Sequence, residues 1–379
     1  YEIGSGLVGS EMCIRDRGIF MLPNQGALFN ERYRILISTD IGGSDADDFQ
    51  SLVHYLLYSD LFDTEGIISS AWGDGRVSDI LEVIDLYEKD YPKLKAYSEK
   101  YPTPEYLRSI AKQGEIDFAP YKGFRTETEG SKWIIECARK QDSRPLYILA
   151  WGLLEDIAQA LHDAPDIVDR IRVNYIGGPN KKWGLNAYEY IRREFPNLWI
   201  IEDNSTYRGW YNGGCQEADY SNSGFVASHV RGHGAMGEYF ASWLDGKIKM
   251  GDTPTVAYFL NGTPENPTGD SWGGSFVPVY HRPCRQYYRD TTIEDKVEIF
   301  EVIEYIFYGP KLDIDFDEPC FKLVVRGQEF NGYSMGNGEY RVRFMAKSLG
   351  VFEYTVVSSI RELNCHMGAF TSVPETLEN

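Results

Sequence analysis

One stretch near the amino terminus, residues 34–52, constrains the fold more than any other part of the chain. It begins with an apolar, β-branched run at residues 35–37, which predicts a buried strand. A loop rich in glycine and aspartate follows, and apolar residues then recur at helical spacing, so we expect a helix to begin near Asp47 or Asp48. A strand, an acidic loop and a helix in this order predict the first unit of an α/β fold.

Four aspartates lie in or beside this loop: Asp40, Asp45, Asp47 and Asp48. Turn formation and helix capping account for one or two of them, but not for four. Four like charges in one loop repel each other unless a cation neutralises them, and carboxylate oxygens are ligands that Ca²⁺ prefers. The loop therefore predicts a metal site, and a structural acidic loop that holds no ion is the alternative.

The alternation of strand and helix continues along the chain. Apolar runs predict further strands at about residues 62–70, 145–150, 171–177 and 198–203, each followed by a helical pattern. This order predicts an α/β fold with a mostly parallel, Rossmann-related sheet flanked by helices. Such sheets bind ligands at the carboxyl ends of their strands, so we expect the loops after these strands to meet at one edge. The polar residues 91–129, which contain four prolines, are interpreted as short helices and loops.

Three regions are expected along the 379 residues. Residues 1–20 are predicted to be a non-native extension, because residues 4–17 resemble translated sequencing-adapter read-through of metagenomic gene models. Residues 31–308 are expected to form the α/β domain. Strand-like segments in residues 312–379 predict a small β-sandwich, and its abrupt end leaves open whether that module is complete.

Composition excludes several classes of partner. The net charge is −19, which speaks against nucleic-acid binding through a basic surface. No apolar run approaches the roughly 18 residues that a membrane span requires. The six cysteines are widely spread without a Cys-x-x-Cys pair, so neither a zinc site nor a dense disulfide framework is indicated.

Five segments resemble those of nucleoside hydrolases and occur in the same order. The first strand and its loop resemble the signature Asp-Thr-Asp-x-Gly-x-Asp-Asp, and later family segments are matched by residues 66–70, 151–158, 176–178 and 250–258. Residues 272–274, Trp-Gly-Gly, are typical of the cellulose-binding-protein branch. Over about residues 33–308 the chain is thus similar to the nucleoside hydrolase-like domain of that family. The tail resembles β-sandwich modules that precede catalytic domains in some glycoside hydrolases.

The resemblance implies a Ca²⁺ site and names its ligands. Carried onto this chain, they are Asp40, the acid pair Asp47–Asp48 with Asp48 as the main ligand, the carbonyl of Trp151, and Asp252. Without the resemblance, a helix cap would be the preferred role of Asp252. Two departures concern the loop, which is two residues longer than the signature and has Ser38 in place of the first signature aspartate. They leave open whether Asp45 replaces one of the acid pair.

The chemistry that the resemblance implies is hydrolysis of an N- or O-glycosidic bond, in which a metal-activated water attacks the anomeric carbon. Asp40 is the candidate base. The family's histidine before the late aspartate is replaced by Gly251, which favours a carbohydrate over a free nucleoside and leaves the general acid open. His233, in a glycine-rich segment before a helix, is the other candidate catalytic residue. Candidate substrate contacts are Asp45, Asp74, Trp72, Asn186 and Trp272.

The expected partner is a small sugar or glycoside, and a homo-oligomer is left open. The rival class is a non-catalytic carbohydrate-binding protein that uses the same metal loop to grip hydroxyls. Secretion or a periplasmic location is expected from the family's link to polysaccharide use. The adapter-like segment hides the true amino terminus, so a missing signal peptide does not indicate a cytoplasmic protein.

Overall fold

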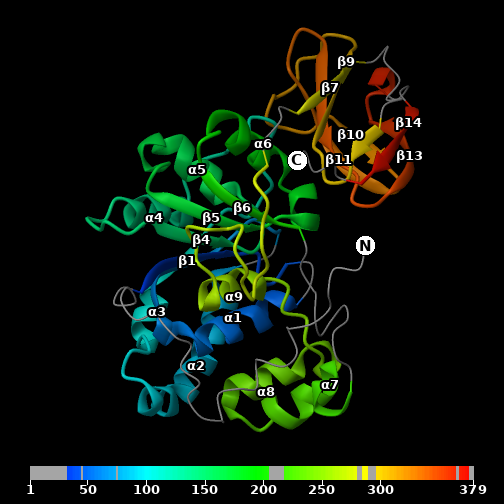
Figure 1. Cartoon of the computed structure of the whole chain (residues 1–379). Helices are drawn as coiled ribbons and strands as arrows, with labels where there is room; N and C mark the ends of the chain where they lie inside the picture. Colours follow the sequence, from blue (N-terminus) through cyan, green and yellow to red (C-terminus); the bar gives the residue numbers. More distant parts are fainter. Residues whose placement is uncertain are drawn as a thin grey trace.

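The computed structural model describes residues 32–43, 46–73, 76–204, 217–279, 284–288, 296–363 and 367–374. These residues form an amino-terminal α/β part and a carboxyl-terminal part made almost entirely of strands (Figure 1). Each part is built on one sheet, and the candidate site lies on the first of them.

The first sheet has six parallel strands in the order β3-β2-β1-β4-β5-β6. The chain starts in the middle, adds β2 and β3 on one side, and then adds β4, β5 and β6 on the other. The strand order therefore reverses between β1 and β4, which is where open parallel sheets bind ligands. The strands are β1 Tyr33–Thr39, β2 Phe62–Ser69, β3 Ala111–Gln113, β4 Leu146–Ala150, β5 Ile171–Ile176 and β6 Trp199–Asp203.

Helices cover both faces of this sheet. Alternate side chains of β1 enter different cores: Leu36 packs in the core that contains α4, α5 and α6, and Ile35 and Ile37 pack in the core that contains α1, α2, α8 and α9. Burial on both faces is the reason that these strands are continuous apolar runs. The helices are α1 Asp47–Leu57, α2 Val77–Tyr97, α3 Pro104–Ile110, α4 Glu129–Ala138, α5 Glu155–Asp163, α6 Leu185–Glu194, α7 Asn222–Phe225, α8 Gly234–Ser242 and α9 Thr253–Asn261.

The second sheet has eight strands in the order β7-β9-β12-β11-β10-β13-β14-β8 and curls around its own core. It is mixed, because β7 pairs with β9 and β8 with β14 in parallel, whereas the other pairs are antiparallel. Phe352, Tyr354 and Val356 point inward from β13, and the residues between them are exposed. The strands are β7 Arg285–Tyr288, β8 Lys296–Glu298, β9 Ile303–Tyr308, β10 Phe321–Val325, β11 Gln328–Ser334, β12 Glu339–Phe344, β13 Gly350–Val357 and β14 Met367–Val373.

The side chain of Arg343 joins the two parts. Arg343 of β12 donates from Nε to Oε1 of Glu304 at 3.2 Å, and both residues are almost fully buried. The same guanidinium donates from Nη1 to the carbonyl of Tyr121 at 2.8 Å and to Oδ1 of Asn186 at 3.2 Å. Because Tyr121 and Asn186 belong to the α/β part, these bonds hold the second sheet against α6.

The predicted fold class is confirmed, with local differences. In the polar region at residues 91–129, α2 continues through Pro92 to Tyr97, and the short strand β3 was not expected. The eight carboxyl-terminal strands form one continuous curled sheet. That sheet already includes β7, β8 and β9, so strands between residues 285 and 308 belong to the second part and not to the first.

The predicted extension at residues 1–20 lies outside the described residues. Within the described part of the chain, no helix combines the length and the apolar character that crossing a membrane would require.

Candidate functional site

Three buried carboxylates meet at the carboxyl edge of the first sheet. Asp47 and Asp48 form the start of α1, and Asp252 is the residue immediately before α9. One oxygen from each lies within 4.8 Å of the others, and the three residues are 6%, 5% and 2% exposed. The side chain of Asp252 makes no capping hydrogen bond to α9, so helix capping does not account for its position.

Two polar residues of α1 fix the segment that carries Asp252. Gln50 is fully buried and donates from Nε2 to the carbonyl of Lys247 at 2.8 Å, while its Oε1 accepts the backbone N–H of Lys249 at 2.7 Å. Ser51 accepts the backbone N–H of Asp252 at 3.3 Å. One helix thus carries two of the acids and positions the third, although the hydrogen-bonded partners are about 200 residues apart in sequence.

The end of β1 adds two groups to the same edge. Thr39 donates its hydroxyl to Oδ1 of Asp48, which orients that carboxylate. Asp40 is buried and packs against Gly152, since a Cβ added at Gly152 would lie 2.6 Å from Cγ of Asp40. Any side chain at Gly152 would displace Asp40, so the glycine after β4 permits this close approach.

The backbone at Trp151 is held at this edge from two sides. Its carbonyl accepts a hydrogen bond from Nδ2 of Asn180 at 2.8 Å, which leaves one of the two lone pairs of that oxygen for another partner. Its indole N–H donates to Oγ1 of Thr255 at 2.8 Å, and that hydroxyl donates to the carbonyl of Asp252 at 2.8 Å. The side chain of Trp151 therefore ties β4 to the start of α9.

The acid cluster of Asp47, Asp48 and Asp252 fits a hard divalent cation. Two oxygen ligands at 2.3–2.6 Å from one Ca²⁺ can be at most about 5 Å apart, and the three oxygens lie within that limit. Three carboxylates removed from water and packed this closely repel each other, and a cation reverses the sign of that interaction. The described residues thus contain a buried acidic triad that can hold a metal.

Of the tryptophans predicted at the site, Trp72 lies beside the acidic loop, and Trp272 lies at the carboxyl end of α9. Trp72 packs against Gly43 of the acidic loop and forms an edge-to-face contact with Trp183, with ring centroids 4.5 Å apart. Trp272 is 45% exposed, and its backbone N–H donates to Asn261 at the end of α9. Trp183 thus forms an aromatic pair with Trp72 near the acidic loop.

Asn186 and His233 are not brought to the cluster. Asn186 bonds to Ala119 and Arg343, so it serves the contact between the two parts of the molecule. His233 is exposed at the start of α8, where Asp90 of α2 accepts the backbone N–H of Ala235 at 2.9 Å.

The distance between His233 and the acidic loop follows from the length of α2. Asp79 of α2 lies beside Gly42 of the acidic loop, and Asp90 is 11 residues further along that helix, or about 16 Å at 1.5 Å per residue. Figure 1 shows α8 beside α2, away from the curled sheet. The predicted substrate contacts Asp45 and Asp74 lie outside the described residues.

Two buried acids that had no predicted role stand at the start of α5. Glu155 and Asp156 are 3% and 0% exposed. Burial raises the pKa of Glu155 to about 8 and the pKa of Asp156 to about 6. Asp156 accepts hydrogen bonds from the hydroxyl of Thr128 and the backbone N–H of Glu115, so it orders the loop between β3 and α4. In the sequence, two acids between a strand and a helix resemble ordinary helix-capping residues. The sequence therefore gives no sign that Glu155 is buried.

The comparisons with known proteins agree with this geometry. The family model described as "Cellulose-binding Sde182, nucleoside hydrolase-like domain" matches residues 34–276. A model described as a domain of unknown function, DUF5060, matches residues 296–359. No curated protein matches the chain.

Several solved structures are similar to the chain. A nucleoside hydrolase-related hypothetical protein from Saccharophagus degradans, described as associated with carbohydrate metabolism, aligns over 91% of this chain and 100% of its own, with 19% identity and a TM-score of 0.54. An inosine-guanosine nucleoside hydrolase aligns over 63% of this chain and 81% of its own, with 14% identity and a TM-score of 0.42. A putative glycoside hydrolase from Bacteroides vulgatus aligns over 22% and 17%, with 29% identity and a TM-score of 0.19. The first of these shows a shared fold.

Proposed function

The chain belongs to the cellulose-binding, nucleoside hydrolase-like family, and from this membership we propose that it is a Ca²⁺-dependent hydrolase of glycosidic bonds in carbohydrates. The observation that carries the proposal is the acid cluster of Asp47, Asp48 and Asp252, held within 4.8 Å at the carboxyl edge of the sheet. The cluster lies next to the end of β1, where the strand order of the sheet reverses. Burying charged groups costs free energy of folding, so a buried acid cluster at that position indicates a ligand site.

The residues of the edge divide the chemistry between them. Asp47, Asp48 and Asp252 supply oxygen ligands for Ca²⁺, and the carbonyl of Trp151 adds another. When bound, the ion would orient sugar hydroxyls and make a nearby water easier to deprotonate. Asp40 accepts the proton of the attacking water, and the oxygen of that water replaces the leaving group at the anomeric carbon. A single direct displacement of this kind inverts the anomeric configuration.

Two features of the edge support a carbohydrate as the substrate. Gly251 stands where an imidazole would precede Asp252 in hydrolases of free nucleosides, so no histidine at that position can protonate a departing base. The pair of Trp72 and Trp183 offers ring surface beside the acidic loop, and aromatic rings stack on the apolar faces of sugars. Sugar recognition would then come from the rings and the cation together.

The second candidate function is carbohydrate binding without hydrolysis. The observation in its favour is the description of the family, which names cellulose binding and no reaction. In that case the same cation would hold two sugar hydroxyls, and Asp40 would be only a ligand. The two functions share a site and differ in whether a proton is transferred.

A hydrolysis screen separates them. Aryl glycosides, oligosaccharides and nucleosides are incubated with wild-type protein and with the Asp40→Asn variant, each with Ca²⁺ or with a chelator. The enzyme reading predicts turnover of a glycoside that requires Ca²⁺ and falls about 10²–10⁴-fold in Asp40→Asn. Ca²⁺-dependent retention on an insoluble polysaccharide, without turnover of any substrate, would establish the binding reading instead.

A further inference from the structure

Three buried oxygens on the α5 face of the first sheet have no hydrogen-bond partner among the described residues. They are Oε2 of Glu155, the hydroxyl of Tyr175 and Oγ of Ser38, and these residues are 3%, 0% and 0% exposed. A buried polar group without a partner costs about 1–3 kcal/mol, so three on one face require an explanation. A ligand or water that they share would supply one.

Strand register places two of these groups on a single surface. Ser38 of β1 is paired with Ala150 of β4, and Ala150 is paired with Tyr175 of β5, so all three side chains point to the same face. Ser38 and Tyr175 are therefore two strand spacings apart, about 9–10 Å, with only a methyl group between them.

Tyr175 is within electrostatic range of both the candidate base and Glu155. Burial, with the nearby carboxylates of Glu202, Glu155 and Asp40, raises the pKa of Tyr175 well above its ordinary value. The Tyr175 hydroxyl thus keeps its proton and has both Asp40 and Glu155 close to it. The chain brings these acids together through a short connection, because Gly152, which packs against Asp40, is only three residues before Glu155.

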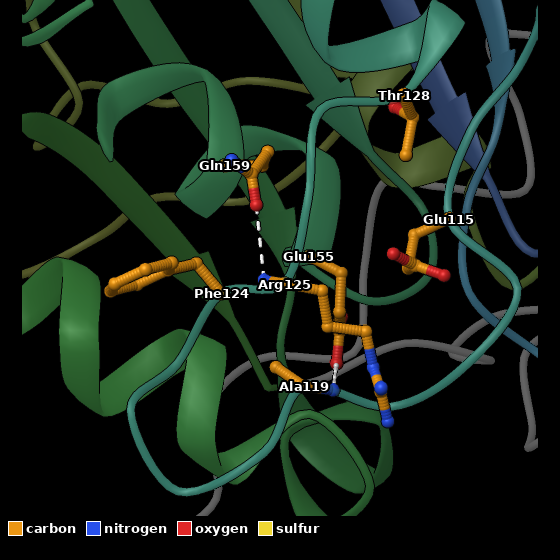
Figure 2. Close-up of a pocket in the computed structure, with 7 residues that line it drawn as sticks. All are labelled: Glu115, Ala119, Phe124, Arg125, Thr128, Glu155 and Gln159. Atoms are coloured by element: carbon orange, nitrogen blue, oxygen red, sulfur yellow. Dashed lines mark hydrogen bonds between the residues drawn. The ribbon is translucent and has the colours of Figure 1, made fainter. Parts of the chain in front are cut away.

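The carboxyl group of Glu155 is buried near two other acids. Its Oε1 accepts the backbone N–H of Ala119 at 3.3 Å, and the nearest ionisable neighbours are Glu115 and Asp156, both acidic. Arg125 lines the same small hollow (Figure 2). Its guanidinium donates to the carbonyl of Phe118. Burial, together with the nearby carboxylates of Asp156 and Glu115, raises the pKa of Glu155 to about 8, so its carboxyl group holds its proton near neutral pH.

The aromatic pair connects Glu155 to the acidic loop. Trp72 packs on Gly43, Trp183 packs on Trp72, and Gly184, the residue after Trp183, lies against Glu155, where an added Cβ would be 3.5 Å from Oε2. A sugar stacked on these rings would therefore lie between the acidic loop and Glu155.

We propose that Glu155 is the proton donor to the leaving group in the hydrolysis, with Tyr175 as the positioning residue between Glu155 and Asp40. This inference rests on the proposed function. As the bond from the anomeric carbon to the leaving oxygen breaks, that oxygen takes the proton of Glu155, while Asp40 takes one proton from the attacking water. Transfer of the proton on Asp40 to the Glu155 carboxylate, through Tyr175 or solvent, restores both groups. Two carboxyl groups of different environment thus divide the acid and base roles.

Glu155 suits this role better than the other candidates do. Both oxygens of Asp156 accept bonds from the preceding loop, so its carboxylate is occupied. His233 lies about 16 Å along α2 from the acidic loop. Of the three, Glu155 combines an unpartnered oxygen with a position three residues after Gly152, which packs against Asp40.

The test compares Glu155→Gln with the matched variant Glu189→Gln. Glu189 is equally buried, also has an unpartnered Oε2 and a pKa raised by burial, but it lies on α6 beside Cys284 and not at the carboxyl edge. Substrates are glycosides of one sugar with a poor (alkyl) or a good (dinitrophenyl) leaving group. Glu155→Gln should lose about 10²–10⁴-fold in kcat/KM on the alkyl glycoside and less than about tenfold on the dinitrophenyl glycoside. It should also lose the alkaline limb of the pH profile, whereas Glu189→Gln should keep the wild-type profile.

Each outcome bears on a different statement. An equal loss on both glycosides, or no loss on either, overturns the role of Glu155 while the proposed function stands. Wild-type protein that hydrolyses no glycoside overturns the proposed function and this inference with it. Should Glu155→Gln fail to fold, Tyr175→Phe gives the same decision. It should lower kcat by about tenfold and shift the alkaline limb with KM unchanged, and an unaltered pH profile would contradict the assignment.

Discussion

The first sheet carries two sets of buried acids, and the two sets have opposite electrostatics. On the α1–α9 side, Asp47, Asp48 and Asp252 crowd within 4.8 Å of one another. On the α5 side, Glu155 is buried near Asp156 and Glu115, and one of its oxygens has no hydrogen-bond partner among the described residues. Crowded carboxylates are relieved by a cation, whereas a single carboxyl group away from any cation is relieved by keeping its proton. In the proposed mechanism, spacing rather than residue type decides which buried acid serves as a metal ligand and which as the proton donor.

The largest expected effect concerns the proton on Glu155. Its folded pKa is about 8 against an ordinary value of 4.5, so between these pH values the folded state binds more protons than the unfolded state. The free energy of unfolding should therefore fall as pH rises through this window, by on the order of 3–5 kcal/mol from this residue, and stay level outside it. Glu155→Gln removes that slope. Urea unfolding at several pH values measures the slope of the free energy of unfolding against pH. If wild type and Glu155→Gln have the same slope, Glu155 does not hold its proton in the folded state, and the two sets of acids do not differ in this way.

A smaller effect on stability is expected for the acid cluster of Asp47, Asp48 and Asp252. It should change from stabilising to destabilising when Ca²⁺ is added. Asp47→Asn removes one of three mutually repelling charges, so in a chelator it should stabilise the protein by about 1–3 kcal/mol. With saturating Ca²⁺ the variant should be less stable than wild type, because it loses a ligand. The control Asp85→Asn removes an exposed aspartate paired with Arg108 and should show no reversal. A destabilised Asp47→Asn in chelator would mean that the cluster is not under repulsion.

The smallest effect tests how the cluster is positioned. Ser51→Ala removes the hydroxyl that accepts the backbone N–H of Asp252, and cation affinity should fall by about tenfold with little change in stability. Ser59→Ala is the matched control, since Ser59 is also buried and bonds to the carbonyl of Leu56 near the far end of α1. Calcium titrations of the two variants give the answer, and equal affinities would show that Ser51 does not position Asp252.

Sequence predicted the parts of the site that local patterns encode. The apolar run before Asp40 and the helical spacing after Asp48 placed these acids between a strand and a helix, and the structure begins α1 at Asp47. Asp252 could be predicted only through the resemblance, because its local pattern is that of a helix cap. The cluster became visible once distant segments were brought together by the fold.

The remaining features depend on contacts that no local pattern reveals. Gln50 and Ser51 read as ordinary polar helix positions, since their partners are about 200 residues away. Glu155 is buried by the loop at Ala119, whose position follows from β3, a strand of only three residues. His233 was predicted at the site because of the glycines around it. The sequence does not show that the start of α8 is bonded to Asp90 of α2.

We propose that the acid cluster binds a divalent cation, and calorimetric titration of chelator-treated protein with Ca²⁺ tests this binding most directly. The account predicts one saturable binding event in wild type, weakened roughly 100-fold or more in Asp252→Asn. The same event should persist in Glu155→Gln, whose substitution lies on the other side of the sheet. Absence of binding in wild type, or equal affinity in Asp252→Asn, would contradict the account.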